Sequence, residues 1–316
     1  MGMRKIDLSL PRRVLIIAGP TASGKSRFAL ELAKKYGGVI INCDSMQVYD
    51  ELKIITARPS HSDEINIPHK LYGIISVTDS FSVGIWRNLA ISEIKACWEF
   101  GKLPIITGGT GLYIKALMEG LSEVPIVSKR IREAAIQRRK RIGAEAFHDE
   151  LSKFDPESAE RLDITDTQRV IRAYEVFMAT NFPLSHWHKQ EKKTVLFPAN
   201  YQTIIFEPPR DTLYAKCEDR LEFMLKNGAL NEVRVLKNMN LDPNCPAMKA
   251  LGVPEFLAYL DNKMSLDEAL YGAKQATRRY AKRQTTWFRN QIIQNYRLKA
   301  QYSKRLLPEI FSNIII

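Results

Sequence analysis

A glycine-rich segment near the N-terminus has the residue types and spacing of a phosphate-binding loop. The pattern GxxxxGK[ST] is matched by Gly19, Pro20, Thr21, Ala22, Ser23, Gly24, Lys25 and Ser26, between an apolar run and a segment with helical periodicity. Its glycines let backbone N–H groups point at one anion at the start of a helix. Lys25 then supplies a cation to the terminal phosphate, and Ser26 is the predicted Mg²⁺ ligand. The segment predicts a protein that binds a di- or triphosphate.

The phosphate loop leaves open which group is transferred, so the acids near it matter. ATPases with this loop carry an Asp, after an apolar strand, that holds the metal. The apolar run at 103–107 ends in Gly-Gly-Thr instead, and the available acid is Asp44, after the run at 39–43. Because the carboxyl ends of parallel strands converge on the ligand crevice, we expect Asp44 and Thr110 to face the phosphate loop. The alternative is that Asp44 is a plain turn residue.

Short β-rich runs alternate with helical patterns in the segments that must position these residues. Strands are predicted over 14–18, 38–43, 103–107 and 201–206, and helices over 25–36, 81–100, 213–227 and 267–298. From about 120 to 179 the pattern is helical without a clear strand, which indicates an insertion. We therefore expect an α/β fold of the P-loop NTPase type, a parallel sheet flanked by helices. Residues 1–120 would form the first part of the core, 121–199 a helical insertion domain, and 200–316 the return to the core with basic C-terminal helices.

The charge of the chain indicates a polyanionic partner. Its 316 residues, 45% hydrophobic and 26% charged, are typical of a globular protein of about two domains and exclude a disordered or collagen-like chain. Lys and Arg number 47 against 35 Asp and Glu, a net charge of +12. The segment 128–141 carries seven basic residues and one acidic, and 269–308 carries ten basic and none acidic. One-signed helices suit a phosphate backbone, whereas the alternative is an inert basic surface with inward-packed aromatic residues.

The cysteines and apolar runs exclude several other classes. Four cysteines lie far apart with no CxxC pair, which argues against a disulfide framework and a cysteine zinc site. The longest apolar runs fall far short of the ~18 residues that span a bilayer. The run at 14–18 leads into a glycine-rich turn, which indicates a strand and not a signal peptide. We expect a cytoplasmic monomer with no membrane partner.

Six segments carry a family resemblance through most of the chain. They are GPTASGKS at 19–26, DSMQVY at 44–49, GGTGLYIKAL at 108–117, QRVIRAYEV at 168–176, DRLEFML at 219–225 and TRRYAKRQTTWFR at 277–289. The phosphate loop alone is generic, whereas GGTxxY and the last segment are far more specific. On these segments the chain resembles the bacterial tRNA dimethylallyltransferases, also called tRNA isopentenyltransferases.

The resemblance implies a reaction. Members of the family transfer a dimethylallyl group from dimethylallyl diphosphate to the exocyclic N6 amine of adenosine at tRNA position 37, and pyrophosphate leaves with the assistance of Mg²⁺. The implied partners are therefore tRNA and dimethylallyl diphosphate, with the helical insertion as a tRNA-binding domain. The residues accommodate this, because the phosphate loop would hold the diphosphate and the basic surfaces would hold tRNA.

The resemblance also assigns roles to single residues. Asp44 matches the family's general base, and a carboxylate suits that step because the amine loses a proton as its nitrogen is alkylated. Positions that bind or neutralise the diphosphate are matched by Thr21, Lys25, Ser26 and Arg220. For Arg220 the alternative is a surface ion pair with Asp219 or Glu222. Positions that contact tRNA are matched by Asp44, Ser45, Met46, Gln47, Thr110, Arg132, Gln168, Arg169, Val170, Ile171 and Arg172.

One segment departs from the family, and three other functions stay open. ALGVPE at 250–255 replaces the usual GYRQ or GYRE and is closer to the adenylate isopentenyltransferases that make cytokinins. An adenylate isopentenyltransferase is therefore the first alternative, and Thr110 and the basic charge favour tRNA over it. A P-loop nucleotide kinase would leave GGTxxY unexplained. A non-catalytic RNA-binding protein would have little reason to keep Lys25, Ser26 and Asp44.

Overall fold

The computed structural model describes residues 12–190, 197–243, 245–292 and 296–308, and it divides into two compact units. One unit comprises Met1–Met118 with Phe197–Ile316, and the other comprises Glu119–Leu196. Within the described ranges, no helix has the length and apolar character needed to cross a membrane.

The first unit is built on a sheet whose described strands are all parallel, in the order β3-β2-β4-β1-β5-β6. The strands are β1 (Arg13–Ala18), β2 (Gly38–Asn42), β3 (His69–Lys70), β4 (Leu103–Gly108), β5 (Asn200–Phe206) and β6 (Tyr296–Leu298). In the registers, Ile17 of β1 lies opposite Thr107 of β4 and Ile204 of β5. The predicted parallel sheet flanked by helices is confirmed, and its order places the ends of β1, β2 and β4 next to one another.

Helices cover both faces of this sheet because its strands are apolar on both sides. Leu15 and Ile17 pack with α1 (Lys25–Tyr36), which has the predicted bounds. Val14 and Ile16 point to the other face, where they pack with α3 (Val83–Glu99) and α4 (Gly111–Glu119). The site at the strand ends therefore rests on two buried cores.

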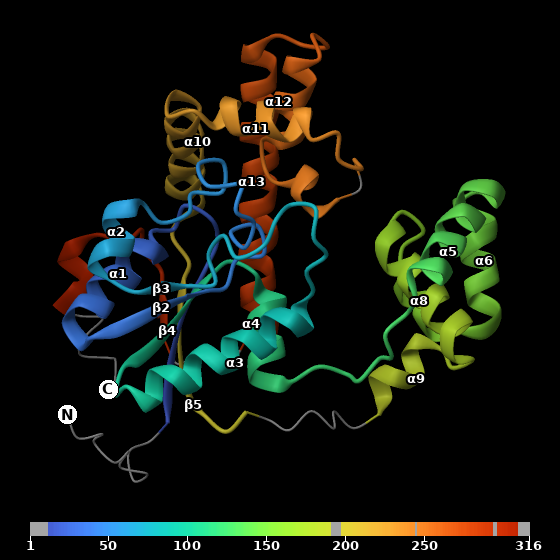
Figure 1. Cartoon of the computed structure of the whole chain (residues 1–316), viewed down its shortest axis with the longest axis horizontal. Coiled ribbons are helices and arrows are strands. Elements are labelled where there is room, and N and C mark those ends of the chain that lie inside the picture. The colour runs from blue at the N-terminus through green and yellow to red at the C-terminus, as the bar shows by residue number, and fades with distance from the viewer. Residues whose placement is uncertain (1–11, 191–196, 244, 293–295, 309–316) are drawn as a thin grey trace. The chain divides into compact units, whose positions relative to one another are not determined.

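A group of C-terminal helices forms a further core of the same unit. It consists of α10 (Arg210–Lys226), α11 (Ala229–Asn238), α12 (Val253–Leu260) and α13 (Leu266–Gln291). The long helix α13 packs beside α10 and α12 (Figure 1). Buried Leu221, Val233 and Phe256 meet Val48 and Leu52, which come from the segment after β2. This segment carries Asp44, so the helices support the loop that holds the acid.

The prediction of one helix over 267–298 is wrong at its C-terminal end. α13 ends at Gln291, residues 293–295 lie outside the described residues, and Tyr296–Leu298 form β6 beside β5. Leu298 is buried with Phe28 and Phe206 in the core under α1, so burial on the sheet decides the state of this short run. The smaller elements of the unit are α2 (His61–Asn66), the 3₁₀ helices η1 (Pro246–Lys249) and η2 (Lys304–Leu306), and β3.

The described secondary structure of the second unit is all helical, and a segment without secondary structure at 120–128 precedes its first helix. Its helices are α5 (Lys129–Ile142), α6 (Ala144–Phe154), α7 (Pro156–Arg161), α8 (Thr167–Thr180) and α9 (Leu184–Lys189). Phe147 and Leu151 of α6 are buried with Val170 and Val176 of α8, so this unit has a hydrophobic core of its own.

Candidate active site

The phosphate loop joins β1 to α1 in a conformation that leaves little room for side chains. Gly24 stands before the first helical residue with φ +90°, and Gly19 has φ +148°. A Cβ on Gly19 would lie 2.7 Å from the carbonyl oxygen of Phe206, so a larger residue would displace the loop from β5. The buried hydroxyl of Ser23 has no hydrogen-bond partner within the described part of the chain. A loop of this kind, opening a helix, fits an anion.

Gln284 of α13 ties the phosphate loop to the loop after β4. Its Oε1 accepts the N–H of Thr21 at 2.8 Å, and its Nε2 donates to the carbonyl of Gly109 at 2.8 Å. Only 6% of Gln284 is exposed, so these bonds are shielded from water. One N–H of the loop is therefore engaged by the protein itself. Gln284 was not predicted as a site residue, because the pattern of charges dominates the sequence of this helix.

Asp44 lies in a tight turn after β2 and is also open to a cavity. Buried Asn42 accepts the N–H of Asp44 at 2.8 Å, and Asp44 Oδ1 accepts the N–H of Met46 at 3.0 Å. The hydroxyl of Thr110 accepts the N–H of Ser45 at 2.9 Å, so Thr110 supports the turn that holds the acid. The two interpretations of Asp44, as turn residue and as site acid, are compatible.

A cavity of about 230 Å³ brings several predicted residues together. Its polar residues include Thr21, Asp44 and Arg220, and apolar side chains such as Ile55 and Met224 share the wall. The remaining lining residues are Ser45, Met46, Thr56, Cys217, Leu221, Lys249, Ala250, Leu251, Thr277, Tyr280 and Arg283. A charged end and an apolar wall in one cavity suit a ligand with a polar head and a hydrocarbon group.

Lys25, Arg220 and Asp44 set the electrostatics beside the phosphate loop, and Lys249 and Arg283 add two further cations to the cavity wall. Lys25 is buried, its Nζ donates to the carbonyl of Pro20 at 3.2 Å, and burial lowers its pKa to about 8. The charge of Arg220 lowers the pKa of Lys25 further, while Asp44 opposes the shift. Burial also lowers the pKa of Arg220. Because cations exceed carboxylates here, an anionic ligand would relieve the repulsion between Lys25 and Arg220.

The alternative interpretation of Arg220 as a surface ion-pair partner is wrong. Its two candidate partners are engaged elsewhere, Asp219 with Lys216 at 3.0 Å and Glu222 with Lys274. Arg220 instead lines the cavity.

Three residues of α13 line the cavity, although they were predicted only as part of the basic stretch 269–308 and not as cavity residues. Thr277, Tyr280 and Arg283 recur every third position, and the Arg283 guanidinium lies 5.5 Å from the centre of the Tyr280 ring. Arg278, by contrast, pairs with Glu218 of α10. The stretch 269–308 was expected to form a phosphate-binding surface. This expectation is corrected for Arg278, which links α13 to α10. The three-residue period on one helix face was the signal that would have found the cavity residues.

The departing segment 250–255 divides between the cavity and the core. Ala250 and Leu251 line the cavity, whereas Val253 is fully buried and Pro254 lies in the first turn of α12.

The donor set fits Mg²⁺ bound jointly with a phosphate. No cluster of three His, Cys, Asp or Glu residues able to hold a metal occurs among the described residues. Mg²⁺ keeps several waters and commonly needs only one or two protein oxygens beside substrate phosphates. The side chain of Ser26, exposed in the first turn of α1, supplies such an oxygen.

The remaining predicted residues belong to the second unit. Arg132, Gln168 and Arg169 are exposed there, and Arg172 pairs with Glu175 at 2.7 Å. Val170 and Ile171 are 1% and 9% exposed and form part of the core of this unit. The expectation of tRNA contact is therefore corrected for these two side chains, because helical periodicity turns them inward.

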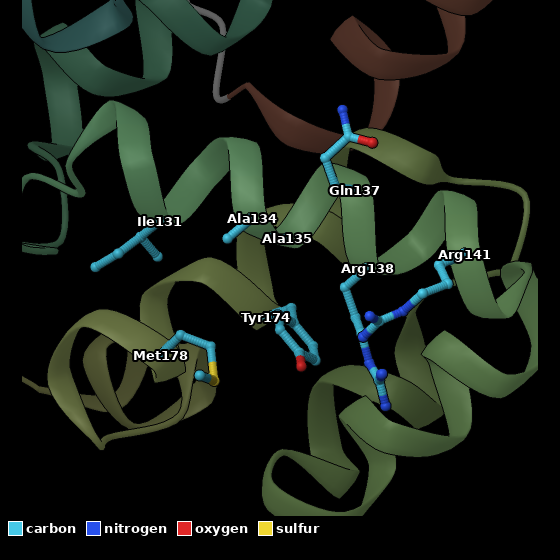
Figure 2. A pocket seen from close by; sticks show the side chains of 8 residues that line it. All are labelled: Ile131, Ala134, Ala135, Gln137, Arg138, Arg141, Tyr174 and Met178. Atoms are coloured by element: carbon cyan, nitrogen blue, oxygen red, sulfur yellow. The ribbon is translucent and has the colours of Figure 1, made fainter.

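The second unit also holds a larger cavity, of about 530 Å³, between α5 and α8 (Figure 2). Arg138, Arg141 and Tyr174 line it with mostly apolar neighbours, and the lining residues that the structure describes include no acid. It offers neither a phosphate loop nor a general base, so the candidate active site is the smaller cavity of the first unit.

Fold and site together define an α/β protein of the phosphate-loop class with an acid and two cations beside the loop. Comparison with family models is more specific: the model described as IPP transferase matches residues 47–291, and the model described as Isopentenyl transferase matches residues 12–76. The chain belongs to the IPP transferase family.

Individual relatives agree with this assignment. A protein of Rhodospirillum centenum named tRNA dimethylallyltransferase is 49% identical over 281 residues, covering 89% of this chain and 90% of the relative. A crystal structure of a full-length tRNA isopentenylpyrophosphate transferase from Bacillus halodurans has a TM-score of 0.69 at 32% identity and 95% coverage of both chains. A eukaryotic dimethylallyltransferase, described as acting on tRNA, has a TM-score of 0.74 at 26% identity, covering 96% of this chain and 72% of that one.

Proposed function

We propose that this chain transfers a dimethylallyl group from dimethylallyl diphosphate to the N6 amine of adenosine at tRNA position 37 and releases pyrophosphate. The observation that carries the proposal is one cavity that joins Thr21 of the phosphate loop, the acid Asp44 and the cation Arg220. The names of the relatives, tRNA dimethylallyltransferase and tRNA isopentenylpyrophosphate transferase, support the same reaction.

The phosphate loop and its cations would hold the donor. Thr21, Lys25 and Arg220 bind the diphosphate, and their charges stabilise the pyrophosphate as negative charge builds up on it during cleavage of the carbon–oxygen bond. Mg²⁺ held by Ser26 would neutralise part of that charge. Ile55, Leu221 and Met224 in the cavity wall suit the dimethylallyl group.

Asp44 would act on the acceptor. Its carboxylate accepts a proton from the N6 amine as the nitrogen bonds to the allylic carbon, which keeps the product amine neutral. Asn42 and the N–H of Met46 hold Asp44 in one orientation before the acceptor arrives. This fixed geometry lowers the entropic cost of bringing base and amine together.

Exposed cations would bind the tRNA backbone. Arg130 and Arg132 of α5 and Arg279 and Lys282 of α13 are exposed, and phosphate contacts need no more than that. The tRNA substrate places the proposed reaction in the cytoplasm. We expect a monomer to suffice, because a single chain supplies all the cavity residues named above.

The test is an acceptor comparison. The purified chain, Mg²⁺ and labelled dimethylallyl diphosphate are incubated with bulk tRNA and separately with AMP. We expect label in tRNA, recovered after digestion as N6-modified adenosine. Label in AMP but not in tRNA would favour an adenylate isopentenyltransferase.

A further inference from the structure

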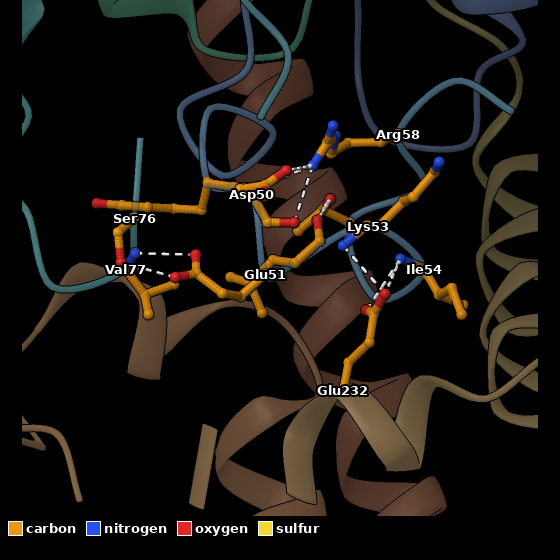
Figure 3. A network of polar contacts seen from close by, with 11 residues as sticks. Asp50, Glu51, Lys53, Ile54, Arg58, Ser76, Val77 and Glu232 are labelled. Atoms are coloured by element: carbon orange, nitrogen blue, oxygen red, sulfur yellow. Dashed lines mark hydrogen bonds and ion pairs between the residues drawn. The ribbon is translucent and has the colours of Figure 1, made fainter. Parts of the chain in front are cut away.

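Glu232 of α11 makes a set of contacts that lies outside the cavity. Its carboxylate accepts the N–H groups of three consecutive residues. The distances are 3.1 Å from Lys53 and 2.7 and 2.9 Å from Ile54 (Figure 3). The third N–H, that of Ile55, lies at 2.9 Å. Three neighbouring N–H groups that converge on one point form a nest for an anion. Here the anion is a side chain of the same chain, which comes from almost 180 residues further along.

The turn that Glu232 holds is a wall of the active site. It is closed by the N–H of Ala57, which donates to the carbonyl of Ile54 at 2.9 Å. Ile55 and Thr56 line the cavity. Charge-assisted hydrogen bonds are about twice as strong as neutral ones, so loss of the carboxylate would release this wall from α11.

A chain of hydrogen bonds continues from this turn to Asp44. The side-chain amide of Gln47 donates to the carbonyls of Thr56 at 2.8 Å and Ala57 at 3.0 Å. The backbone N–H of Gln47 donates to the carbonyl of Asp44 at 3.2 Å. Movement of the turn would therefore be transmitted through Gln47 to the turn that orients the acid.

We infer that Glu232 is a positioning residue, which holds Asp44 in place through the turn at 53–57 and Gln47. The inference rests on the proposed function, in which Asp44 is the general base. The phosphate loop is held separately, by Gln284, so Glu232 should affect the proton transfer and not the binding of the diphosphate.

The first test uses Glu232→Gln, which keeps the size of the side chain but removes its charge. We expect kcat for tRNA to fall about 10- to 100-fold, the range expected when a reacting group is misplaced by about 1 Å. The affinity for pyrophosphate, which contacts the phosphate loop and not the turn at 53–57, should stay unchanged. The matched control is Asp63→Asn, because Asp63 also accepts a backbone N–H, that of Ser60 at 3.2 Å, but caps α2 outside the cavity. Its kcat should stay within two-fold of the wild type. An equal loss in both variants, or an unchanged kcat in Glu232→Gln, would overturn the inference.

A second test separates this inference from the proposed function, because it needs no activity. Amide hydrogen exchange of the full chain should quicken in Glu232→Gln at Ile54 and also at Met46, whose N–H is bonded to Asp44. Faster exchange at Ile54 alone would show that the turn does not communicate with the acid and would overturn the inference even if the enzyme is active. If the wild type fails to modify tRNA, the proposed function is wrong. The comparison of exchange rates at Met46 between the wild type and Glu232→Gln would still test the inference.

A double-mutant cycle with Gln47→Ala completes the design. Because both residues act through one turn, the loss in kcat of the double variant should be smaller than the product of the two single losses. Independent, multiplicative losses would count against the path. If Glu232→Gln does not fold, Glu232→Asp takes its place, since it keeps the charge but shortens the reach.

Discussion

The two carboxylate oxygens of Asp44 have different surroundings. Oδ1 accepts the N–H of Met46, while Oδ2 has no hydrogen-bond partner in the part of the chain that the structure describes. An acid held by one oxygen and open at the other is oriented and still able to accept a proton. The turn therefore fixes the orientation of the carboxylate, and the cavity leaves its second oxygen accessible to a substrate.

Replacement of Asp44 by Asn should separate binding from chemistry. The amide keeps an oxygen for the N–H of Met46 but cannot act as a general base, so we expect single-turnover transfer to fall about 10²- to 10⁴-fold. Affinity for dimethylallyl diphosphate, measured by calorimetry, should change little. A transfer rate within a few-fold of the wild type would reassign Asp44 as a turn residue.

Lys25 should make donor binding depend on pH. Its pKa is lowered to about 8, so the free enzyme loses this cation as the pH rises through that value, and affinity for pyrophosphate should weaken by up to about tenfold for each further pH unit. Calorimetric titrations on both sides of the pKa measure this. Lys25→Arg is the control, because arginine stays charged and its profile should be flatter. A wild-type affinity that does not change through the pKa would exclude contact between Lys25 and the ligand.

At the scale of elements, α13 holds the site together. One face carries Thr277, Tyr280 and Arg283 into the cavity, and Gln284 joins two strand-end loops. The next turn carries Trp287, and a Cβ built on Gly111 would lie only 2.0 Å from a carbon of the Trp287 ring. The glycine after Thr110 therefore allows α13 to approach the start of α4.

Two glycine substitutions test this close approach. Gly111→Ala forces the new methyl group into the Trp287 ring and should cost about 1–3 kcal/mol of unfolding free energy. Gly272→Ala, inside α13, meets only Glu255 Cγ at 3.3 Å and should gain roughly 0.5–1 kcal/mol from its lower unfolded-state entropy. Urea unfolding of both variants measures the difference. A Gly111→Ala variant as stable as the wild type would show that α13 can move away from α4.

The elements also show what a sequence can and cannot predict here. The bounds of α1 and the parallel core followed from local patterns, since the phosphate loop and alternating apolar runs are local signals. β6 was missed because its three residues become a strand only by pairing with β5. Glu232 left no signal, because its partners are backbone N–H groups that any residue carries. Features fixed by distant partners lie beyond local pattern analysis.

At the scale of the whole molecule, the cations behind the net charge of +12 fall into two groups, those in ion pairs and those exposed to solvent. Arg278 and Arg138 are used in ion pairs with Glu218 and Glu150, while other cations on the same helices, such as Arg132, are exposed. Paired arginines hold helices together, and exposed ones remain for a polyanion. Net charge alone does not separate these two groups.

Exposed cations of α5 should therefore set part of the salt dependence of tRNA binding. Each phosphate contact contributes about −0.7 to −0.9 to the slope of log K against log salt, so Arg130→Gln with Arg132→Gln should make the slope shallower by roughly 1.4 to 1.8. The control removes the same charge from Lys216 and Lys263, which pair with Asp219 and Asp261 at 3.0 Å. Its slope should hardly change, and both melting temperatures should stay near that of the wild type, because exposed cations add little stability. Titrations of tRNA at several salt concentrations measure the slopes. Equal slope changes in the two double variants would mean that net charge, and not contact at α5, governs binding.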